Sequence, residues 1–337
     1  MRRVISGLAA CVAMGAMPAY AQRPPAVSAV RLDLYDRVFT REYQGAISPG
    51  QTEHFSRKVK LGRDGRIAIA NFAGNISVTV GGGDEVSIDA VKRGRPADLQ
   101  QAEITVSEGP GRVDIQAGSS SRRVSVDFTV VVPASAAVDL RSVSGDISVT
   151  GVRGAVRAEA INGTVTTAGT PRLEVAKTVS GDLAVTDAGS DGDVSLGSVS
   201  GGVSVKGLKA RGLDLQTVSG DTTLANIRCD RVGIRSVSGG VAFSGTLAKS
   251  GRYDITAHSG DISLTLDGGT GFDVEASSFS GSIHSALPVT PRGPGPAPVG
   301  AGRPKGPASN RLVGTYGDAS AQLTLRSFSG DITIQKP

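Results

Sequence analysis

The sequence predicts an all-β fold, a single-stranded β-solenoid with right-handed coils, and three observations lead to it. A short motif recurs at nearly constant spacing, apolar and polar residues alternate around it, and glycine is abundant while aromatic residues are scarce. The 337 residues include 46 Gly but only 8 Phe, 5 Tyr and no Trp. This composition disfavours a core of large side chains and favours many tight turns.

The motif has the form Val-Ser-Gly-Asp or a close variant. Its glycines are Gly145, Gly163, Gly181, Gly201, Gly220, Gly239, Gly260, Gly281 and Gly330. The first eight follow one another at 18 to 21 residues, and a gap of 49 precedes the last. Alternation such as Leu213 and Leu215 before Gly220 is typical of half-buried strands. We therefore expect about nine rungs of 18–21 residues, stacked so that neighbouring coils bury each other's apolar side.

The N-terminal residues 1–21 have the features of a signal peptide. Arg2 and Arg3 precede an uncharged apolar run, and Ala19-Tyr20-Ala21 is a typical cleavage pattern. The run is too short to span a membrane. One alternative stays open, because Leu8-Ala9-Ala10 before Cys11 resembles a lipidation signal.

The rest of the chain divides by composition and regularity. Residues 22–55 form a lead-in segment, and residues 56–135 form a less regular β-rich cap with a degenerate corner at Ala73-Gly74. Residues 136–337 hold the solenoid repeats, interrupted by a Pro/Gly-rich loop at 287–311. We expect the cap to protect the end of the stack from edge pairing, and the loop to be flexible.

The Ser-Gly steps are interpreted as the corners of the coils. Glycine supplies the backbone freedom that a sharp corner needs, and a short hydroxyl beside it can satisfy amides of the turn or of a stacked neighbour. The structural corner residues are Ser144, Gly145, Ser180, Gly181, Ser219, Gly220, Ser259, Gly260, Ser329 and Gly330. A row of catalytic serines is disfavoured because no nucleophile-elbow motif surrounds them.

An aspartate follows the glycine in alternate rungs. These residues are Asp146, Asp182, Asp221 and Asp261. Because like charges on adjacent strands repel, the alternation indicates a solvated edge on which the carboxylates are kept apart. The alternative is a weak cation or ligand column, although the nonapeptide of calcium-loaded β-rolls is missing. We predict no cofactor and no metal.

The residue before each corner serine forms a further column of mostly apolar residues. Its members are Val143, Ile161, Val179, Val199, Val218, Val237, His258, Phe279 and Phe328. Strict alternation would point this column outward, but we expect a bend at the corner to turn it inward. An outward column would be an apolar stripe of the kind that marks a partner surface.

Three stretches of the chain resemble the bacterial DUF4097 family. Residues 66–93 contain Ala73-Gly74-Asn75-Ile76, residues 126–166 contain Ser144-Gly145-Asp146-Ile147, and the C-terminus contains Ser329-Gly330-Asp331-Ile332. The resemblance covers most of residues 56–337. It implies a β-helical, exported protein with an adhesin label and offers no catalytic residues. The Pro-rich insertion departs from the family pattern.

These observations favour a non-enzymatic exported cell-envelope protein, in the periplasm or at the cell surface, that binds a surface polymer or protein partner along the solenoid. A polysaccharide-active enzyme and a self-assembling scaffold are the alternatives. The net charge of +5 comes without a basic block interleaved with aromatics, which disfavours nucleic acid. With 2 Cys and 3 His, a Cys-rich zinc module is excluded. His258 and His284 are expected on adjacent rungs at different offsets, which disfavours a histidine pair.

Overall fold

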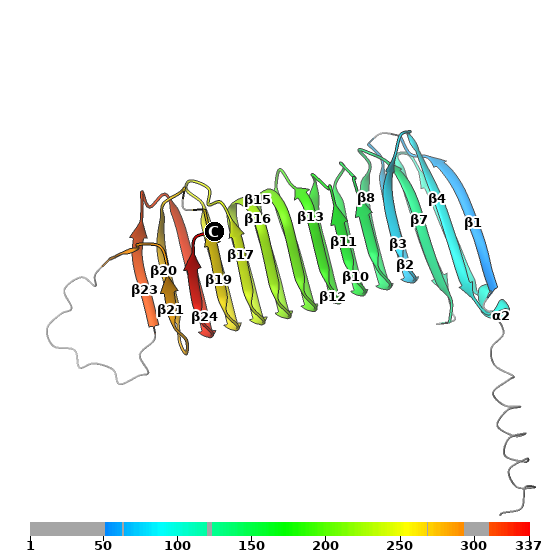
Figure 1. Ribbon diagram of the computed structural model, residues 1–337. Coiled ribbons are helices and arrows are strands. Elements are labelled where there is room, and N and C mark those ends of the chain that lie inside the picture. Colours follow the sequence, from blue (N-terminus) through cyan, green and yellow to red (C-terminus); the bar gives the residue numbers. More distant parts are fainter. Residues whose placement is uncertain (1–50, 63, 120–122, 268, 293–309) are drawn as a thin grey trace, which may run out of the picture. The chain divides into compact units, whose positions relative to one another are not determined.

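The computed structural model describes residues 51–62, 64–119, 123–267, 269–292 and 310–337. All of them belong to one compact unit, residues 49–337 (Figure 1). The expected signal peptide, Cys11 and most of the expected lead-in lie outside the described residues. The described part is all-β, with one short helix, α2 (Pro96–Leu99). Within this part, no helix has the length and apolar character needed to cross a membrane.

The strands stack in two ladders that meet at the glycine corners. The first ladder contains, in spatial order, β5 (Ala102–Gly109), β6 (Arg112–Ser119), β2 (Arg66–Ala73), β8 (Ala137–Ser144), β10 (Val156–Asn162), β12 (Leu173–Ser180), β14 (Asp193–Ser200), the second halves of β15 (Val203–Ser219) and β16 (Thr222–Ser238), β18 (Arg252–Ser259), β24 (Ala321–Ser329), β20 (Phe272–Ser278), β23 (Asn310–Tyr316) and β22 (Thr290–Pro291).

The second ladder follows each corner in the chain. It contains β1 (Gln51–Lys60), β4 (Glu85–Gly94), β7 (Ser125–Pro133), β3 (Ile76–Gly81), β9 (Ile147–Thr150), β11 (Val165–Ala168), β13 (Leu183–Gly189), the first halves of β15 and β16, β17 (Val241–Gly245), β19 (Ile262–Leu266), β25 (Ile332–Gln335) and β21 (Ile283–Ser285). The repeated coils pair in parallel and in register, so equivalent residues of successive coils lie beside one another.

The core is a continuous column of inward-facing aliphatic side chains. Val149 and Val165 of the second ladder face inward with Leu140 and Ala158 of the first, and all four are fully buried. Most of the core side chains are Val, Ile, Leu or Ala. The expected alternation of inward and outward residues is therefore seen along every regular coil.

The coils do not stack entirely in chain order. The last strand of the first ladder in sequence, β24, pairs with β18 on one side and β20 on the other. Consequently the coil of Gly330 lies between those of Gly260 and Gly281. Along the sequence, the outer coil with β20 and β21 comes first. The chain then runs back through the antiparallel strand β23 and continues into β24 and β25, which lie between the outer coil and the coil of Gly260. The expectation that His258 and His284 lie on adjacent rungs is therefore wrong.

Antiparallel strands close both ends of the stack. At the N-terminal end β1, β4 and β5 pair antiparallel with their neighbours, and at the other end β23 and β22 do so. β1 begins at Gln51, inside the expected lead-in. β22 and the start of β23 fall inside the expected loop at 287–311, of which residues 293–309 are not described. A stack of parallel strands would expose an unpaired strand edge to which another chain could pair. The antiparallel strands take the place of such an edge.

Candidate binding surface

The corner glycines meet two separate requirements of the backbone. Gly145, Gly181 and Gly220 have φ of 133°, 148° and 127°, a region that residues with a side chain rarely adopt. A Cβ on Gly181 would also overlap the carbonyl oxygen of Gly163 in the neighbouring coil, and the same holds along the column. Gly260 and Gly330 share this geometry, with φ of 146° and 152°. These five glycines thus have positive φ and stack closely on a glycine of the neighbouring coil.

The hydroxyls that serve these corners belong to a column that the sequence interpretation missed. Ser144, Ser180, Ser219, Ser259 and Ser329 are exposed. In several coils a buried hydroxyl three residues before the corner glycine instead donates to the glycine carbonyl of the neighbouring coil. Thr178 Oγ1 donates to Gly163 O at 2.9 Å, Ser198 Oγ to Gly181 O at 3.2 Å, and Ser278 Oγ to Gly330 O at 2.9 Å. The signal was present in the sequence as Ser or Thr three residues before most corner glycines.

The aspartates after the glycines bind backbone amides of the next coil. Asp146 Oδ1 accepts from Thr164 N at 2.8 Å, Asp182 Oδ1 from Gly202 N at 2.8 Å, and Asp221 Oδ1 from Gly240 N at 2.9 Å. Asp261 Oδ1 accepts from Asp331 N at 2.8 Å, so these two aspartates lie on adjacent coils because of the inserted strand β24. The alternation inferred from chain order therefore fails at this end. One oxygen of each aspartate acts as a link between coils.

Asp331 completes this series at the C-terminal end. Its Oδ1 accepts from the backbone N–H of Ser282 at 2.7 Å and from the Ser282 hydroxyl at 2.8 Å. These two hydrogen bonds, the backbone one first, lower the pKa of the Asp331 carboxyl. Within the described residues, no group of three or more His, Cys, Asp or Glu side chains is arranged to hold a metal ion. The cation column stays a prediction.

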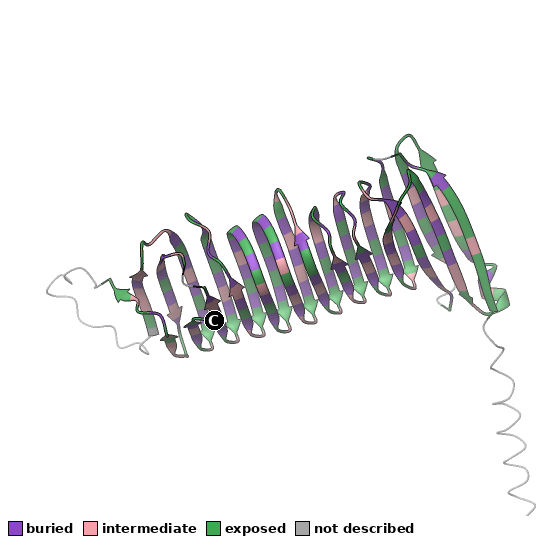
Figure 2. Ribbon diagram, turned by 45° about the horizontal axis from the view of Figure 1, so that its top comes forward, coloured by how far each residue is buried: buried purple, intermediate pink, exposed green. Residues whose placement is uncertain are grey.

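The residue before each corner serine points outward, and the expectation that a bend would turn it inward is wrong. Glycine at the corner itself makes the turn, so alternation along the strand continues undisturbed up to the serine. We call this column the apolar stripe (Figure 2); in spatial order it contains Phe72, Val143, Ile161, Val179, Val199, Val218, Val237, His258, Phe328 and Phe279. The nine apolar side chains are 37% to 49% exposed.

Aromatic rings form the C-terminal end of the stripe. Phe328 stacks on Phe279 with ring centroids 4.8 Å apart and an interplanar angle of 5°. On its other side His258 stacks at 4.9 Å and 10°. The rings lie parallel at the strand spacing because the inserted coil of β24 holds Phe328 between the other two. The stripe thus ends in a flat aromatic ladder.

At the N-terminal end the stripe forms the floor of a groove of about 980 Å³. Six stripe residues line it, from Phe72 to Val218. Residues of β5 and β6, including Glu103, Thr105 and Gln116, line it as well. Gly197 leaves additional room next to Val199, since it has no side chain. The groove is therefore elongated and largely aliphatic along one side.

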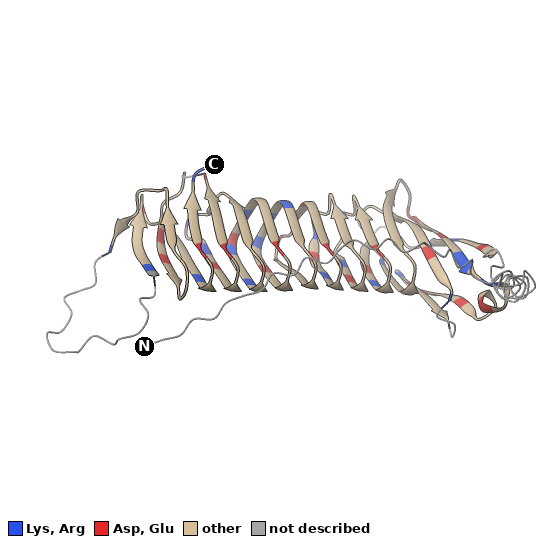
Figure 3. Ribbon diagram, turned by 60° about the horizontal axis from the view of Figure 1, so that its bottom comes forward, with Lys and Arg blue, Asp and Glu red and all other residues tan. Residues whose placement is uncertain are grey.

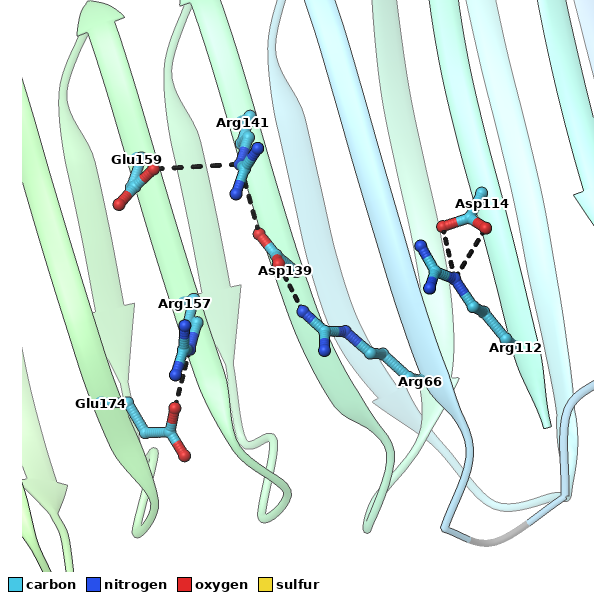
Figure 4. Close-up of polar contacts among 8 residues, drawn as sticks. All are labelled: Arg66, Arg112, Asp114, Asp139, Arg141, Arg157, Glu159 and Glu174. Atoms are coloured by element: carbon cyan, nitrogen blue, oxygen red, sulfur yellow. Dashed lines mark hydrogen bonds and ion pairs between the residues drawn. The ribbon is translucent and has the colours of Figure 1, made fainter.

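Charged side chains flank the stripe on the same face (Figure 4). Asp139 lies between Arg66 Nη2, at 2.7 Å, and Arg141 Nε, at 3.6 Å, and Arg141 Nε is also 3.8 Å from Glu159. Further along, Arg157 Nε donates to Glu174 at 2.7 Å. Because the three arginine side chains are more than half exposed, each pair adds little to stability. Figure 3 shows charged residues spread along the stack instead of gathered at one point.

Cys229 and Tyr253 lie in the core, away from the stripe. Burial raises the pKa of the Cys229 thiol to about 11. The Tyr253 hydroxyl donates to Cys229 O at 2.8 Å and accepts from Ala248 N at 2.8 Å, and burial raises its pKa too. These contacts hold the chain between β16 and β18 and mark Cys229 as a structural thiol.

Residues 64–335 match the family described as Toastrack DUF4097. The chain belongs to this family. The match covers nearly all of the described coils and the closing strands other than β1, and it agrees with the resemblance carried by the short motifs. A comparison with curated proteins gave no match.

Solved structures similar to this Toastrack protein come from bacteria. A "putative adhesin" from Bacteroides fragilis NCTC 9343 is 13% identical, with 85% of this chain and 97% of that chain covered and a TM-score of 0.42. Another from Parabacteroides distasonis ATCC 8503 is 11% identical, with the same coverages and a TM-score of 0.36. A "putative lipid binding protein" from the latter organism is 10% identical, again with these coverages, and has a TM-score of 0.32.

Proposed function

We propose that this Toastrack protein is an exported, non-enzymatic cell-envelope protein with an adhesin-like role, and that the apolar stripe is its binding surface. The observation that carries the proposal is the outward position of the stripe across successive coils. Single exposed apolar residues are ordinary on protein surfaces, but contiguous apolar patches mark interaction sites. The names given to the similar structures and the family membership are consistent with such a role.

The use of the carboxylates supports binding over catalysis. A polysaccharide-active site needs carboxylates that converge on one bond. Here Asp146, Asp182 and Asp221 each link successive coils, and Asp139 and Glu174 are held by arginines. These assignments account for the regular carboxylates as structural groups. We also keep as proposals that the coils are right-handed and that about nine of them, not counting the degenerate coil of Gly74, are regular rungs of 18–21 residues.

Binding to envelope material tests the proposed function. The purified protein is incubated with envelope fractions of its source bacterium, and the bound fraction is measured. Val179→Lys with Val218→Lys places two charges on the stripe, and Thr166→Lys with Thr223→Lys places the same charges on exposed positions of the second ladder. We expect the stripe variant to lose binding and the control to keep it. Equal binding by both variants would show that the stripe is not the binding surface.

Export is a separate part of the proposal with its own test. The full chain is expressed in a bacterial host, and the N-terminus of the mature protein is sequenced. Cleavage after Ala21 leaves Gln22 as the first residue, while lipidation would leave a modified Cys11 at the N-terminus. Recovery of an uncleaved chain in the cytoplasm would contradict export.

A further inference from the structure

We infer that the partner of the apolar stripe is a second copy of this chain, packed stripe to stripe with both stacks running in the same direction. The inference rests on the proposed function, since it names the partner of the same surface. The inference is drawn from two rows of residues, one on each side of the stripe. The first row is formed by the residues four positions before each corner glycine, and the second by the residues directly after it.

The two rows differ in charge. The row before the stripe contains four exposed cations and one exposed carboxylate, Glu159; the cations are Arg141, Lys177, Arg235 and Arg326. The row after it contains the exposed carboxylates Asp146, Asp182, Asp221, Asp261 and Asp331. In three coils the order along the chain is cation, stripe residue, aspartate. The stripe is therefore bordered by positive charge on one side and negative charge on the other.

This asymmetry selects one orientation of a second copy. A two-fold axis parallel to the stack exchanges the two borders, so the cation row of one copy faces the aspartates of its partner. A two-fold axis perpendicular to the stack and lying in the interface preserves the borders and places aspartates opposite aspartates. Opposite charges across an interface favour association, whereas juxtaposed like charges oppose it.

The charges of the two copies can be compared coil by coil, because in this arrangement each coil faces the same coil of the second copy. The facing residues would be Ala70 and Asn75, Arg141 and Asp146, Glu159 and Thr164, Lys177 and Asp182, Gly197 and Gly202, Gln216 and Asp221, Arg235 and Gly240, Thr256 and Asp261, Arg326 and Asp331, and Ser277 and Ser282. Three of these pairs join opposite charges and three join a carboxylate to an amide or hydroxyl. In these ten coils, none joins like charges.

The cations and aspartates of the two rows can still form ion pairs with a second copy. Lys177 and Arg326 make no ion pair within the described residues, and Arg141 has only the longer contacts described above. The aspartates use Oδ1 for the neighbouring coil, so Oδ2 can accept from a partner. The stripe supplies the apolar centre, in which Val179 would meet the same valine of the second copy. Three rows over ten coils give about 30 residues a side, enough for a stable interface of ordinary size.

Sedimentation equilibrium of the purified full chain measures the self-association. We expect a monomer–dimer equilibrium for the unaltered protein, and Val179→Lys with Val218→Lys should raise the dissociation constant at least about 30-fold, as loss of one central hot-spot residue does. Thr166→Lys with Thr223→Lys should leave it unchanged. Circular dichroism and thermal unfolding check that both variants are folded. A protein that stays monomeric at about 100 µM, or a dimer that both variants leave intact, would overturn the inference.

Cysteine cross-linking tests the orientation. With Cys11→Ser, Val143→Cys and Val237→Cys are made singly at positions five coils apart. In the parallel arrangement each variant cross-links to its own second copy under oxidation. In the opposite orientation, with all ten coils overlapping, the coil of Val143 faces that of Phe328 and the coil of Val237 faces that of Val179. Neither variant would then cross-link to its own second copy, and that outcome would contradict the inference.

Envelope binding and dimer formation through the stripe can be distinguished by experiment. A protein that binds envelope fractions through the stripe yet never dimerises would keep the proposed function and overturn the inference. A dimer that forms through the stripe but does not bind envelope fractions from cells lacking the protein would support the inference and confine the adhesin-like role to contacts between copies of this chain.

Discussion

At the scale of single residues, the corner glycine carries most of the specificity of the coil. It adopts a positive φ, stacks against the previous glycine, and presents the carbonyl oxygen that a buried hydroxyl binds. The Ser-Gly spacing was sufficient to predict these turns, because positive φ is a local property of glycine. The role of Thr178 could not be inferred in the same way, since it depends on which coil lies alongside.

Replacement of a corner glycine should therefore be costly. Gly220→Ala forces a side chain into a φ of 127° and into the carbonyl oxygen of Gly201. We expect a loss of about 3 kcal/mol or more in the free energy of unfolding, measured by urea denaturation. Gly118→Ala is the control, because a Cβ there meets nothing within 4 Å. Similar stability of the two variants would refute this account of the corner.

The buried hydroxyls offer a matched pair of threonines. Thr178→Val removes the hydrogen bond to Gly163 O and should lower the free energy of unfolding by about 1 kcal/mol. Thr217 is equally buried, but its hydroxyl has no hydrogen-bond partner among the described residues. Thr217→Val should consequently be neutral or slightly stabilising. Urea denaturation of both variants measures the difference, and equal losses would contradict the assignment.

The thiol of Cys229 should report on the integrity of the core. Its pKa of about 11 and its burial leave thiolate about a hundredfold scarcer at pH 8 than for an ordinary thiol with a pKa of 9.0. In a Cys11→Ser background we expect labelling by a disulfide reagent to be slow in buffer and fast in denaturing urea. Rapid labelling of the folded protein would mean that this part of the core opens readily.

At the scale of the elements, local patterns predicted the strands, but their order in space depended on contacts between distant segments. The alternation around Gly330 identifies β24 and β25 without indicating that they lie between two earlier coils. Every coil has a similar apolar side, so the sequence pattern is compatible with several stacking orders. The gap of 49 residues was the available signal, and it was interpreted as a simple insertion.

Asp331 ties the inserted coil to its neighbour, and its contribution should depend on pH. Because hydrogen bonds from Ser282 lower its pKa in the folded protein, the stabilisation is complete above the unfolded-state pKa and is lost as pH falls through the folded-state pKa. We expect Asp331→Asn to lower Tm near neutral pH, and the difference from the unaltered protein to vanish in acid. Asp191→Asn, at an exposed loop position, is the control. A Tm difference that stays constant with pH would contradict the carboxylate's role.

At the scale of the whole coil stack, the all-β solenoid was predictable because the same short motif recurs every 18 to 21 residues along most of the repeats. The binding surface was only partly predictable. The column from Val143 to Phe328 was recognised, but its direction was assigned inward, because apolar residues at corners usually turn toward a core. Its outward position follows because the glycine itself makes the corner, so the alternation along the strand continues up to the serine.

The most direct test of the account is the accessibility of the stripe in its native setting. Val179→Cys and Thr223→Cys are each made with Cys11→Ser, and maleimide labelling is compared between dilute purified protein and intact envelopes. We predict that Val179→Cys is labelled rapidly in dilute solution and much more slowly in the envelope, while Thr223→Cys is labelled equally in both. Equal labelling of Val179→Cys in both settings would show that nothing covers the stripe, and slow labelling in dilute solution would show that the stripe does not face outward.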